Sequence, residues 1–370
     1  MKKIIVYFPY ELKEQKSGSS VRPIKMIEAF RDFGKINHKE IIEIYGNSRE
    51  RKLKLKKLYT QIDPNDIECC YTENATIPLW LTDRDHIPRN PFLDIGFYKY
   101  LQKNNIPLGL FYRDIYWKFD ELYKVNSFVK PIMQSLFKFE LAIYKKYVTC
   151  FYLPSIYMNE YLELHPVEIL PPGGTDLTNF RQNPIDKEVA QAIYVGGIHP
   201  RYGVYEMLEA VQNINNSQMK VSLTLVCRER EFHQFKELFA PYLNSGWLNL
   251  IHAHGEQLVP LYKNADFGIV PIKKDFYNDF AVAVKLFEYI SYGLPVVATN
   301  CSAQKDLVED GEFGVVVEDN AIGLEKGISE MLHYNKRQQY EKNAIESLKQ
   351  KHLWLERTKT VYSSLMHSKN

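Results

Sequence analysis

The most constraining feature of the sequence is a regular alternation of apolar runs and helical patterns in its second half. Six runs rich in Val, Ile and Leu are predicted to be strands, at residues 191–198, 220–227, 248–253, 267–272, 295–299 and 314–319. Helical patterns separate or follow them, at residues 204–213, 231–243, 257–264, 283–292 and 321–334. Strands that alternate with helices and are apolar on both faces form a parallel sheet that helices cover on both sides. Ligands of such sheets bind outside the carboxyl ends of the strands.

The first half follows the same pattern less regularly. Strands are predicted at residues 3–8, 40–45, 106–114, 147–153 and 167–170, and a long amphipathic helix at 129–146. Residues 171–184 are rich in Pro, Gly, Asn and Thr, which is typical of a loop that crosses between domains. Apolar residues at helical spacing predict a final helix that contains Val361 and Leu365. We therefore expect an α/β protein with Rossmann-like domains at 1–175 and 176–350, followed by a C-terminal helix at 351–370.

Composition excludes several classes of function. The 370 residues are enough for two domains of ordinary size, and a net charge of +2 argues against a nucleic-acid partner. The five cysteines have no C-x-x-C spacing, which argues against a zinc site and against a disulfide framework. The N-terminal apolar run is interrupted by Pro9 and Glu11, as expected of a buried strand and not of a signal peptide. Since no apolar stretch is long enough to cross a bilayer, we expect a reduced, cytoplasmic protein.

The helix predicted at 283–292 carries two charges near its start. Lys285 and Glu288 are three residues apart and therefore share one side of the helix. A lysine at a helix N-terminus is unfavourable with the helix dipole unless an anion binds there. The free N–H groups that follow Ala283 would favour such an anion. The alternative is a weak, exposed ion pair between the two side chains.

Five segments carry a resemblance to a known family. They are ILPPGGTDLTNF (169–180), AIYVGGIHPRYGVYEMLEAV (192–211), LVPLYKNADFGIVPI (258–272), LFEYISYGLPVVATN (286–300) and HLWLERTKTVYSSL (352–365). In order and spacing they resemble the motifs of the large retaining family 4 (group 1) of GT-B glycosyltransferases. The resemblance implies the GT-B architecture, in which two Rossmann-like domains face a central cleft and the C-terminal helix crosses back to the first domain.

The resemblance also implies an activity. The second domain would hold a nucleoside-diphosphate sugar of the UDP or GDP type, and the first would hold a saccharide or lipid-linked saccharide whose hydroxyl accepts the sugar. A retaining reaction needs no enzymic nucleophile and is expected to need no metal ion or other cofactor. The base, the sugar, the acceptor, the stereochemical outcome and the oligomeric state are left open. The expected location is the cytoplasm, including the inner face of the membrane.

The family pattern assigns donor-binding roles and also shows departures from them. The implied donor-binding residues are Ala283, Lys285, Glu288, Gly197, Arg201, Arg228 and Asp279. Glu288 matches the glutamate that binds the ribose hydroxyls, whereas an earlier family glutamate falls on Phe280, so Asp279 or Asp275 would have to replace it. The family's phosphate-binding Arg and Lys fall on Gly197 and Tyr202. A bare Gly197 backbone can approach a phosphate closely, and Arg201 or Arg228 would restore the charge, although each arginine could equally be solvated.

The first domain offers catalytic and acceptor-binding candidates. Arg113 and Asp114 follow a predicted strand where family members often have His-Asp, whose histidine contacts the donor sugar. Asp114 could act as a general base in an inverting reaction, or both residues could brace the next helix. Gly18 and Ser19 resemble the family's small-residue loop near the acceptor, although an ordinary strand–helix connection capped by Ser20 fits them nearly as well.

Two further features suggest and limit partners. The basic run Arg49–Lys57 is interleaved with leucines and could lie on an anionic membrane surface, or it could be a solvated helix face. Asp83 and Asp85 mimic a D-x-D metal motif but lie in the half that would bind the acceptor, so no metal site is predicted. Other enzymes of the same fold, an inverting transferase or a nucleotide-sugar epimerase, stay open as alternatives. So does a degenerate, non-catalytic homologue that binds a saccharide or a partner.

Overall fold

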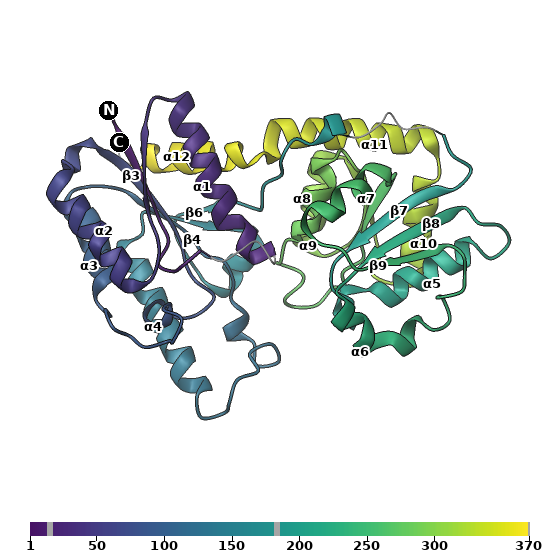
Figure 1. Cartoon of the computed structure of the whole chain (residues 1–370), viewed down its shortest axis with the longest axis horizontal. Helices are drawn as coiled ribbons and strands as arrows, with labels where there is room; N and C mark the ends of the chain where they lie inside the picture. The colour runs from purple at the N-terminus through teal and green to yellow at the C-terminus, as the bar shows by residue number, and fades with distance from the viewer. Residues whose placement is uncertain (13–17, 181–185, 369–370) are drawn as a thin grey trace. The chain divides into compact units, whose positions relative to one another are not determined.

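The chain folds into two compact α/β units, shown as a computed structural model in Figure 1. The structure describes residues 1–12, 18–180 and 186–368. For residues 18–20 it describes the backbone alone. Unit 1 consists of Met1–Pro171 and Trp354–Asn370, and unit 2 of Pro172–Leu353. The sequence analysis placed these divisions at residues 175 and 350. Each unit contains a six-stranded sheet, so the predicted α/β fold with two Rossmann-like parts is confirmed.

The sheet of unit 1 is entirely parallel and contains one strand that the sequence analysis missed. Its strands are β1 (Lys3–Tyr7), β2 (Glu40–Ile44), β3 (Ile67–Glu73), β4 (Leu108–Phe111), β5 (Cys150–Leu153) and β6 (Val167–Ile169). The order across the sheet is β2-β1-β3-β4-β5-β6. The missed strand, β3, lies between β1 and β4 at the centre. The direction in which strands are added reverses between β1 and β3, so the crevice of unit 1 lies at the carboxyl ends of these two strands.

Within the described residues of unit 1, five α-helices surround this sheet. They are α1 (Gly18–Ile36), α2 (Ser48–Gln61), α3 (Leu93–Lys103), α4 (Lys130–Tyr147) and α12 (Trp354–His367). The C-terminal helix α12 packs beside α1 and buries Val361 and Leu365 in the core of unit 1. The hydroxyl groups of Tyr152 and Ser364 also lie 2.6 Å apart. The end of the sequence is thus built into the same unit as its beginning.

The sheet of unit 2 contains all six strands predicted for the second half. They are β7 (Ala190–Val195), β8 (Val221–Val226), β9 (Leu248–Ile251), β10 (Phe267–Val270), β11 (Val296–Thr299) and β12 (Gly314–Val317). All pairings are parallel, in the order β12-β11-β10-β7-β8-β9. The order of addition reverses between β7 and β10, which are neighbours in the sheet although more than seventy residues separate them in the sequence.

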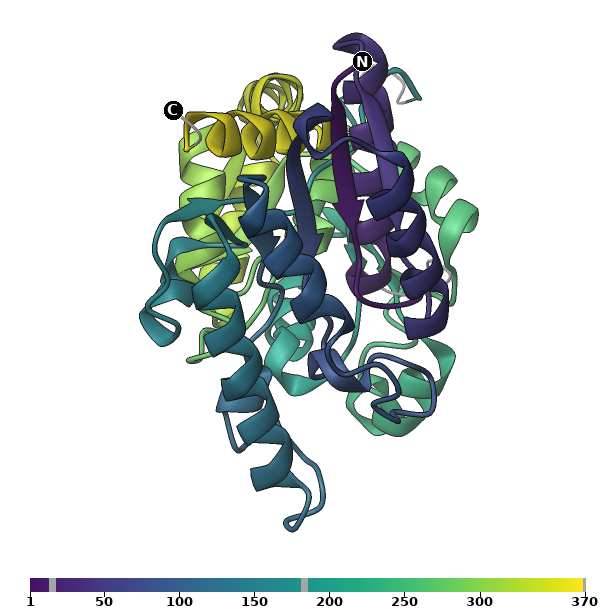
Figure 2. The ribbon, with the colours of Figure 1, turned by 90° about the vertical axis from the view of Figure 1, so that its left-hand side faces the viewer.

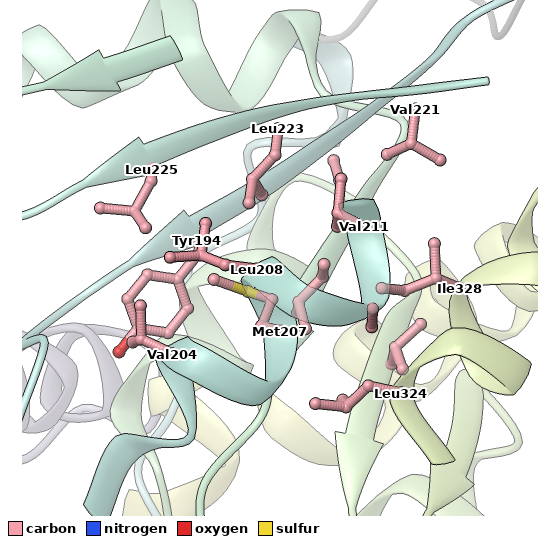
Figure 3. Close-up of a cluster of buried hydrophobic side chains, with 14 of the residues drawn as sticks. Tyr194, Val204, Met207, Leu208, Val211, Val221, Leu223, Leu225, Leu324 and Ile328 are labelled. Carbon is pink, nitrogen blue, oxygen red and sulfur yellow. The ribbon is translucent and has the colours of Figure 1, made fainter. Parts of the chain in front are cut away.

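The described part of unit 2, which omits residues 181–185, contains seven α-helices. They are α5 (Val204–Ile214), α6 (Glu229–Phe239), α7 (Val259–Asn264), α8 (Val284–Ser291), α9 (Ser302–Gly311), α10 (Ala321–Met331) and α11 (Tyr334–Ser347). Figure 3 shows how α5 packs: one side of it meets strand side chains and α10. The residues in this contact are Val204, Met207, Leu208, Val211, Val221, Leu223, Leu225, Leu324 and Ile328. The 3–4 residue spacing within α5 places its apolar residues on this one side.

The basic run Arg49–Lys57 forms most of α2, and its apolar residues face mainly inward. Leu55 and Leu58 are buried, and only Leu53 of the three leucines is exposed. Arg51 is also buried, where its guanidinium contacts the Asp94 carboxylate at 3.3 Å. The exposed side of α2 therefore presents lysines together with two large apolar side chains, Leu53 and Tyr59.

All five cysteines are buried, and none of them is in a disulfide. None of the helices in the described ranges combines the length and the apolar character needed to cross a bilayer.

Candidate functional site

The candidate site of unit 2 lies where the strand order reverses, at the carboxyl ends of β7 and β10. In open parallel sheets this position leaves a crevice between neighbouring loops that ligands occupy. Gly196 and Gly197 follow β7 directly, and residues 271–283 lead from β10 to α8. Because β7 and β10 are neighbours in the sheet, the two glycines lie close to the start of α8.

Lys285 lies in the first turn of α8 and has no ionic partner among the described residues. Its ammonium lies 4.0 Å from the centre of the Tyr194 ring and 5.9 Å from that of Tyr202. It forms no hydrogen bond or ion pair with any residue that the structure describes. Burial lowers the pKa of Lys285 to about 7, although the nearby Glu288 carboxylate opposes this shift. Ala283, at the N-cap, has no side chain that could bond to the free N–H groups of the first turn.

Gly196, which the sequence analysis did not single out, makes room for this lysine. A Cβ atom on Gly196 would lie only 2.6 Å from the Lys285 ammonium nitrogen. Gly197, the glycine that the sequence analysis singled out, lies against the Tyr202 ring and not against Lys285. A Cβ atom on Gly197 would lie 2.8 Å from this ring. The close approach of backbone and cation thus occurs one residue earlier than expected, and the phosphate contact of Gly197 stays a prediction.

Glu288 lies one turn after Lys285 and is half-buried. Its carboxylate accepts a hydrogen bond of 3.0 Å from the Tyr262 hydroxyl, which comes from α7. Burial raises the pKa of Glu288, while Tyr262 and Lys285 act in the opposite direction. One carboxylate oxygen is thus fixed by Tyr262, and the group can still accept hydrogen bonds from hydroxyl groups of a ligand. The sequence analysis did not predict a role for Tyr262, although this residue lies in the segment 258–272. Its hydrogen bond to Glu288 depends on how α7 and α8 pack, which the sequence does not show.

Arg201 and Asp275, two of the predicted substitutes, bind each other. Two nitrogens of the Arg201 guanidinium each lie 2.9 Å from a different oxygen of Asp275. Asp275 also accepts hydrogen bonds from the backbone N–H groups of Tyr277 and Asn278. The pair therefore anchors the loop between β10 and α8. A role for either side chain at a phosphate or a sugar stays a prediction that requires this pair to open.

The other two polar candidates of unit 2 also have local partners. Asp279 accepts hydrogen bonds from the Ser302 N–H at 2.7 Å and the Ser302 hydroxyl at 3.0 Å, at the start of α9. Burial raises the pKa of Asp279, but these bonds and Lys274 together bring it below its ordinary value. Arg228 precedes α6, is largely exposed, and lies 3.2 Å from the Glu231 carboxylate. Neither side chain contacts Lys285 or Glu288 in the described structure.

In unit 1, Arg113 lies at the corresponding reversal of strand order. Its guanidinium donates to Glu73 at 2.8 Å and to the Tyr10 hydroxyl at 2.6 Å. Glu73 ends β3 and is completely buried; it also accepts from Arg22 at 3.2 Å and from the Tyr71 hydroxyl at 2.8 Å. One buried carboxylate thus joins two arginines at the end of the missed strand. These contacts hold Arg113 to residues that precede it in the chain, and both its bracing of the next helix and its catalytic role stay predictions.

The other candidate residues of unit 1 are Asp114, Gly18 and Ser19. Asp114 accepts a hydrogen bond of 3.0 Å from the Tyr116 N–H, at the start of the short 3₁₀ helix Tyr116–Lys118. This contact fits the bracing alternative, and a role as general base stays a prediction. Gly18 and Ser19 form the backbone of the first turn of α1, but their side chains lie outside the described residues. Their acceptor-binding role also stays a prediction.

Both aspartates of the possible metal motif bind other side chains or backbone groups of unit 1. Asp83 accepts from the N–H and the hydroxyl of Ser48 at 2.7 and 2.6 Å, and so caps α2. Asp85 pairs with the Arg89 guanidinium at 2.5 Å. Within the described part of the chain, no three His, Cys, Asp or Glu side chains are grouped so that they could hold a metal ion.

Comparison with known families identifies unit 2. Residues 176–347 match the family described as glycosyl transferases group 1. Unit 2 is a group 1 glycosyltransferase domain. The match spans nearly all of Pro172–Leu353, including β7, β10 and α8, which build the site around Lys285. No curated protein matches the sequence.

Solved structures extend the likeness to the fold of the whole chain, including the part outside the group 1 glycosyltransferase domain. HepE of Anabaena, solved in complex with UDP, is 12% identical with a TM-score of 0.64, over 99% of this chain and 100% of that one. A glycosyltransferase of Rickettsia africae is 15% identical with a TM-score of 0.62, over 99% of both chains. WaaG, a glycosyltransferase involved in lipopolysaccharide biosynthesis, is 15% identical with a TM-score of 0.57, over 96% and 98%. The fold is therefore that of GT-B glycosyltransferases.

Proposed function

We propose that the chain transfers a sugar from a nucleoside-diphosphate sugar, of the UDP or GDP type, to a hydroxyl of a saccharide or lipid-linked saccharide. The observation that carries this proposal is the position of two groups on one side of α8: the Lys285 ammonium, which has no ion pair with any described residue, and the Glu288 carboxylate, which Tyr262 holds in place. An ammonium beside free N–H groups suits a diphosphate, and a carboxylate one turn further suits ribose hydroxyls. Structures of HepE with UDP and with UDP-glucose support the same donor class.

The proposed reaction retains configuration and uses the charge of the site in place of a metal ion. The acceptor hydroxyl attacks the sugar carbon on the face that the diphosphate leaves, and a diphosphate oxygen takes the hydroxyl proton. Negative charge grows on the diphosphate as the bond to the sugar breaks. Lys285 and the N–H groups at the start of α8 stabilise this charge because they are already oriented before the reaction.

A screen of nucleotide sugars tests the activity. We expect one UDP- or GDP-sugar to be consumed and UDP or GDP released, with the rate unchanged by an excess of EDTA. Proton NMR of the product distinguishes a retained from an inverted anomeric centre. Conversion of the donor to its epimer would favour the epimerase alternative, and no binding of any nucleoside diphosphate would favour the non-catalytic one. A rate that EDTA abolishes would contradict the metal-independent proposal.

Replacing Glu288 with alanine should weaken the binding of UDP or GDP by at least about tenfold, because the ribose hydroxyls lose a charged hydrogen-bond acceptor. Isothermal titration calorimetry measures this directly. Glu325→Ala is the matched control, since Glu325 is a half-buried carboxylate on α10 that accepts a hydrogen bond of 3.2 Å from the Asn213 amide. Equal affinity in Glu288→Ala and Glu325→Ala would remove the assignment of Glu288 to the ribose.

A further inference from the structure

The N-terminal part of α4 and the segment before it expose large apolar side chains. The exposed fraction is 84% for Phe128, 62% for Ile132, 46% for Val129 and 39% for Val125. Further along the helix, Phe139 is 47% exposed. Figure 2 shows this teal helix and the loop before it projecting from the rest of unit 1. Soluble proteins rarely leave so many neighbouring apolar side chains open to water without a binding role.

Helix length explains why this part of the chain projects. The 18 residues of α4 span about 27 Å, whereas the four residues of β4 or β5 span roughly 13 Å. The buried side chains of α4 begin only at Phe137, so its first two turns extend beyond the sheet. Because α4 follows β4 in a parallel sheet, its first turn lies at the edge where the strands have their carboxyl ends.

The exposed side of α4 also carries positive charge. Residues 132, 139 and 146 are seven apart and therefore form a stripe along the helix, which reads Ile132, Phe139 and Lys146. Lys138 and Lys145 are exposed beside this stripe, and Lys124 is exposed in the preceding loop. We name these exposed side chains the α4 surface: Val125, Phe128, Val129, Ile132, Phe139, Lys124, Lys138, Lys145 and Lys146.

Nearby carboxylates do not cancel this charge. The stretch from Lys118 to Lys146 contains six lysines, while its carboxylates are Asp120, Glu121 and the buried Glu140. Asp120 is paired with Lys130 at 2.7 Å, which leaves Glu121 as the exposed carboxylate of this stretch that forms no ion pair with a described lysine. The α4 surface is therefore both apolar and cationic, and it exposes five large apolar side chains, whereas α2 exposes two, Leu53 and Tyr59.

We propose that the α4 surface binds an anionic phospholipid membrane. Phe128, Ile132 and Phe139 enter the boundary between headgroups and acyl chains, while Lys138, Lys145 and Lys146 lie among the anionic headgroups. A helix with aromatic and aliphatic residues on one stripe and lysines beside it has the pattern of interfacial membrane helices. Lysines near an anionic surface add attraction that salt screens.

This orientation has a consequence for the acceptor. The membrane would run along the exposed side of α4 and, at the first turn of this helix, reach the carboxyl edge of the sheet in unit 1, where Arg113 and Glu73 meet. A lipid-linked acceptor could then reach that edge without leaving the bilayer. This consequence rests on the proposed function, whereas the membrane contact itself does not and can be measured without any substrate.

Vesicle binding by the full chain tests the proposal. We expect wild-type protein to co-sediment with vesicles of phosphatidylcholine and phosphatidylglycerol and to bind pure phosphatidylcholine at least tenfold more weakly. The double variant Phe128→Ser/Ile132→Ser should bind the anionic vesicles at least tenfold more weakly. So should Lys138→Gln/Lys145→Gln, and its residual binding should depend less on salt. Both variants should keep the nucleotide affinity and unfolding midpoint of wild type, because none of these four side chains is buried.

Matched controls separate the α4 surface from other parts of the chain. Phe92→Ser removes a 74% exposed aromatic side chain on another loop of unit 1, and Ile322→Ser removes a 79% exposed side chain of unit 2. Lys52→Gln/Lys56→Gln/Lys57→Gln removes exposed charge from α2. All three should bind vesicles within threefold of wild type. The proposal is overturned if wild type does not bind anionic vesicles, or if a control variant loses as much binding as the α4 variants. It is also overturned if the α4 variants change only self-association, which would identify a second copy of the chain as the occupant.

Discussion

Replacing Lys285 with glutamine is expected to weaken UDP or GDP binding by about 10- to 100-fold at pH 7. Hydrogen bonds to charged groups contribute about 1.5–3 kcal/mol, and each 1.4 kcal/mol corresponds to about a tenfold change in affinity. Lys285 should be near the upper part of this range, since its ammonium has no ionic or hydrogen-bond partner among the described residues that could hold it elsewhere. Calorimetric titration of wild type and Lys285→Gln with the same nucleotide measures the difference.

The affinity of wild type should also fall as the pH rises above 7. The pKa of Lys285 is about 7 in the free protein, so above this pH the amine is increasingly neutral. A bound diphosphate favours the ammonium form, and binding must therefore take up a proton at pH 8 or 9. Linkage then predicts a loss of up to about tenfold in affinity per pH unit above 7. Between pH 7 and 9 the Lys285→Gln variant should show little of this slope.

Lys285→Arg is the control for this pH effect. A guanidinium stays protonated over the whole range, so the variant should bind nucleotide with a flat pH profile. Titrations in two buffers of different ionisation enthalpy count the protons taken up on binding. If Lys285→Gln kept the same slope as wild type, another group would be taking up the proton and Lys285 would not contact the diphosphate.

The fold was predictable where strands are continuous apolar runs. β10 and β11 are completely buried, and their sequences contain almost only apolar residues. β3 is buried too, but its sequence IECCYTE contains Glu68, Thr72 and Glu73 and has no run of Val, Ile or Leu. The two carboxylates of β3 have partners on other elements: Glu68 binds Lys39 and Tyr362, and Glu73 binds Arg22 and Arg113. A single sequence shows no sign of these partners, and the strand was therefore missed.

The candidate site was predictable only within single elements. The shared side of Lys285 and Glu288 follows from helical spacing alone. The contact between Gly196 and Lys285 depends on β7 lying beside β10, and the bond from Tyr262 to Glu288 depends on the packing of α7 against the same region. Likewise, the pairing of Arg201 with Asp275 joins residues 74 positions apart. Such contacts follow from strand order, which local patterns do not determine.

The most destabilising single change that we predict is Glu73→Gln. Glu73 is completely buried and joins Arg22, which is 6% exposed, to Arg113. Removing one partner of a buried ion pair costs about 3–5 kcal/mol, because the remaining charge stays buried without compensation. Here two guanidinium groups would lose their common carboxylate. Arg357 adds a third cation nearby, since burial and the Arg22 charge lower the pKa of Arg357 to about 9.

Urea unfolding followed by circular dichroism should therefore show a transition for Glu73→Gln at much lower denaturant, with unit 1 unfolding first. Glu43→Gln is the matched control: Glu43 binds Arg31 through two hydrogen bonds of 2.6 and 2.8 Å, but the Arg31 side chain is 50% exposed. An exposed pair of this kind contributes about 0–1 kcal/mol. If Glu73→Gln and Glu43→Gln had equally small effects, water would have to reach the Arg22–Glu73–Arg113 cluster, and Arg113 would then be free to turn toward a substrate. A large effect of Glu73→Gln alone would instead mean that Arg113 is a fixed charge at the carboxyl edge of its sheet, and that any substrate must come to it.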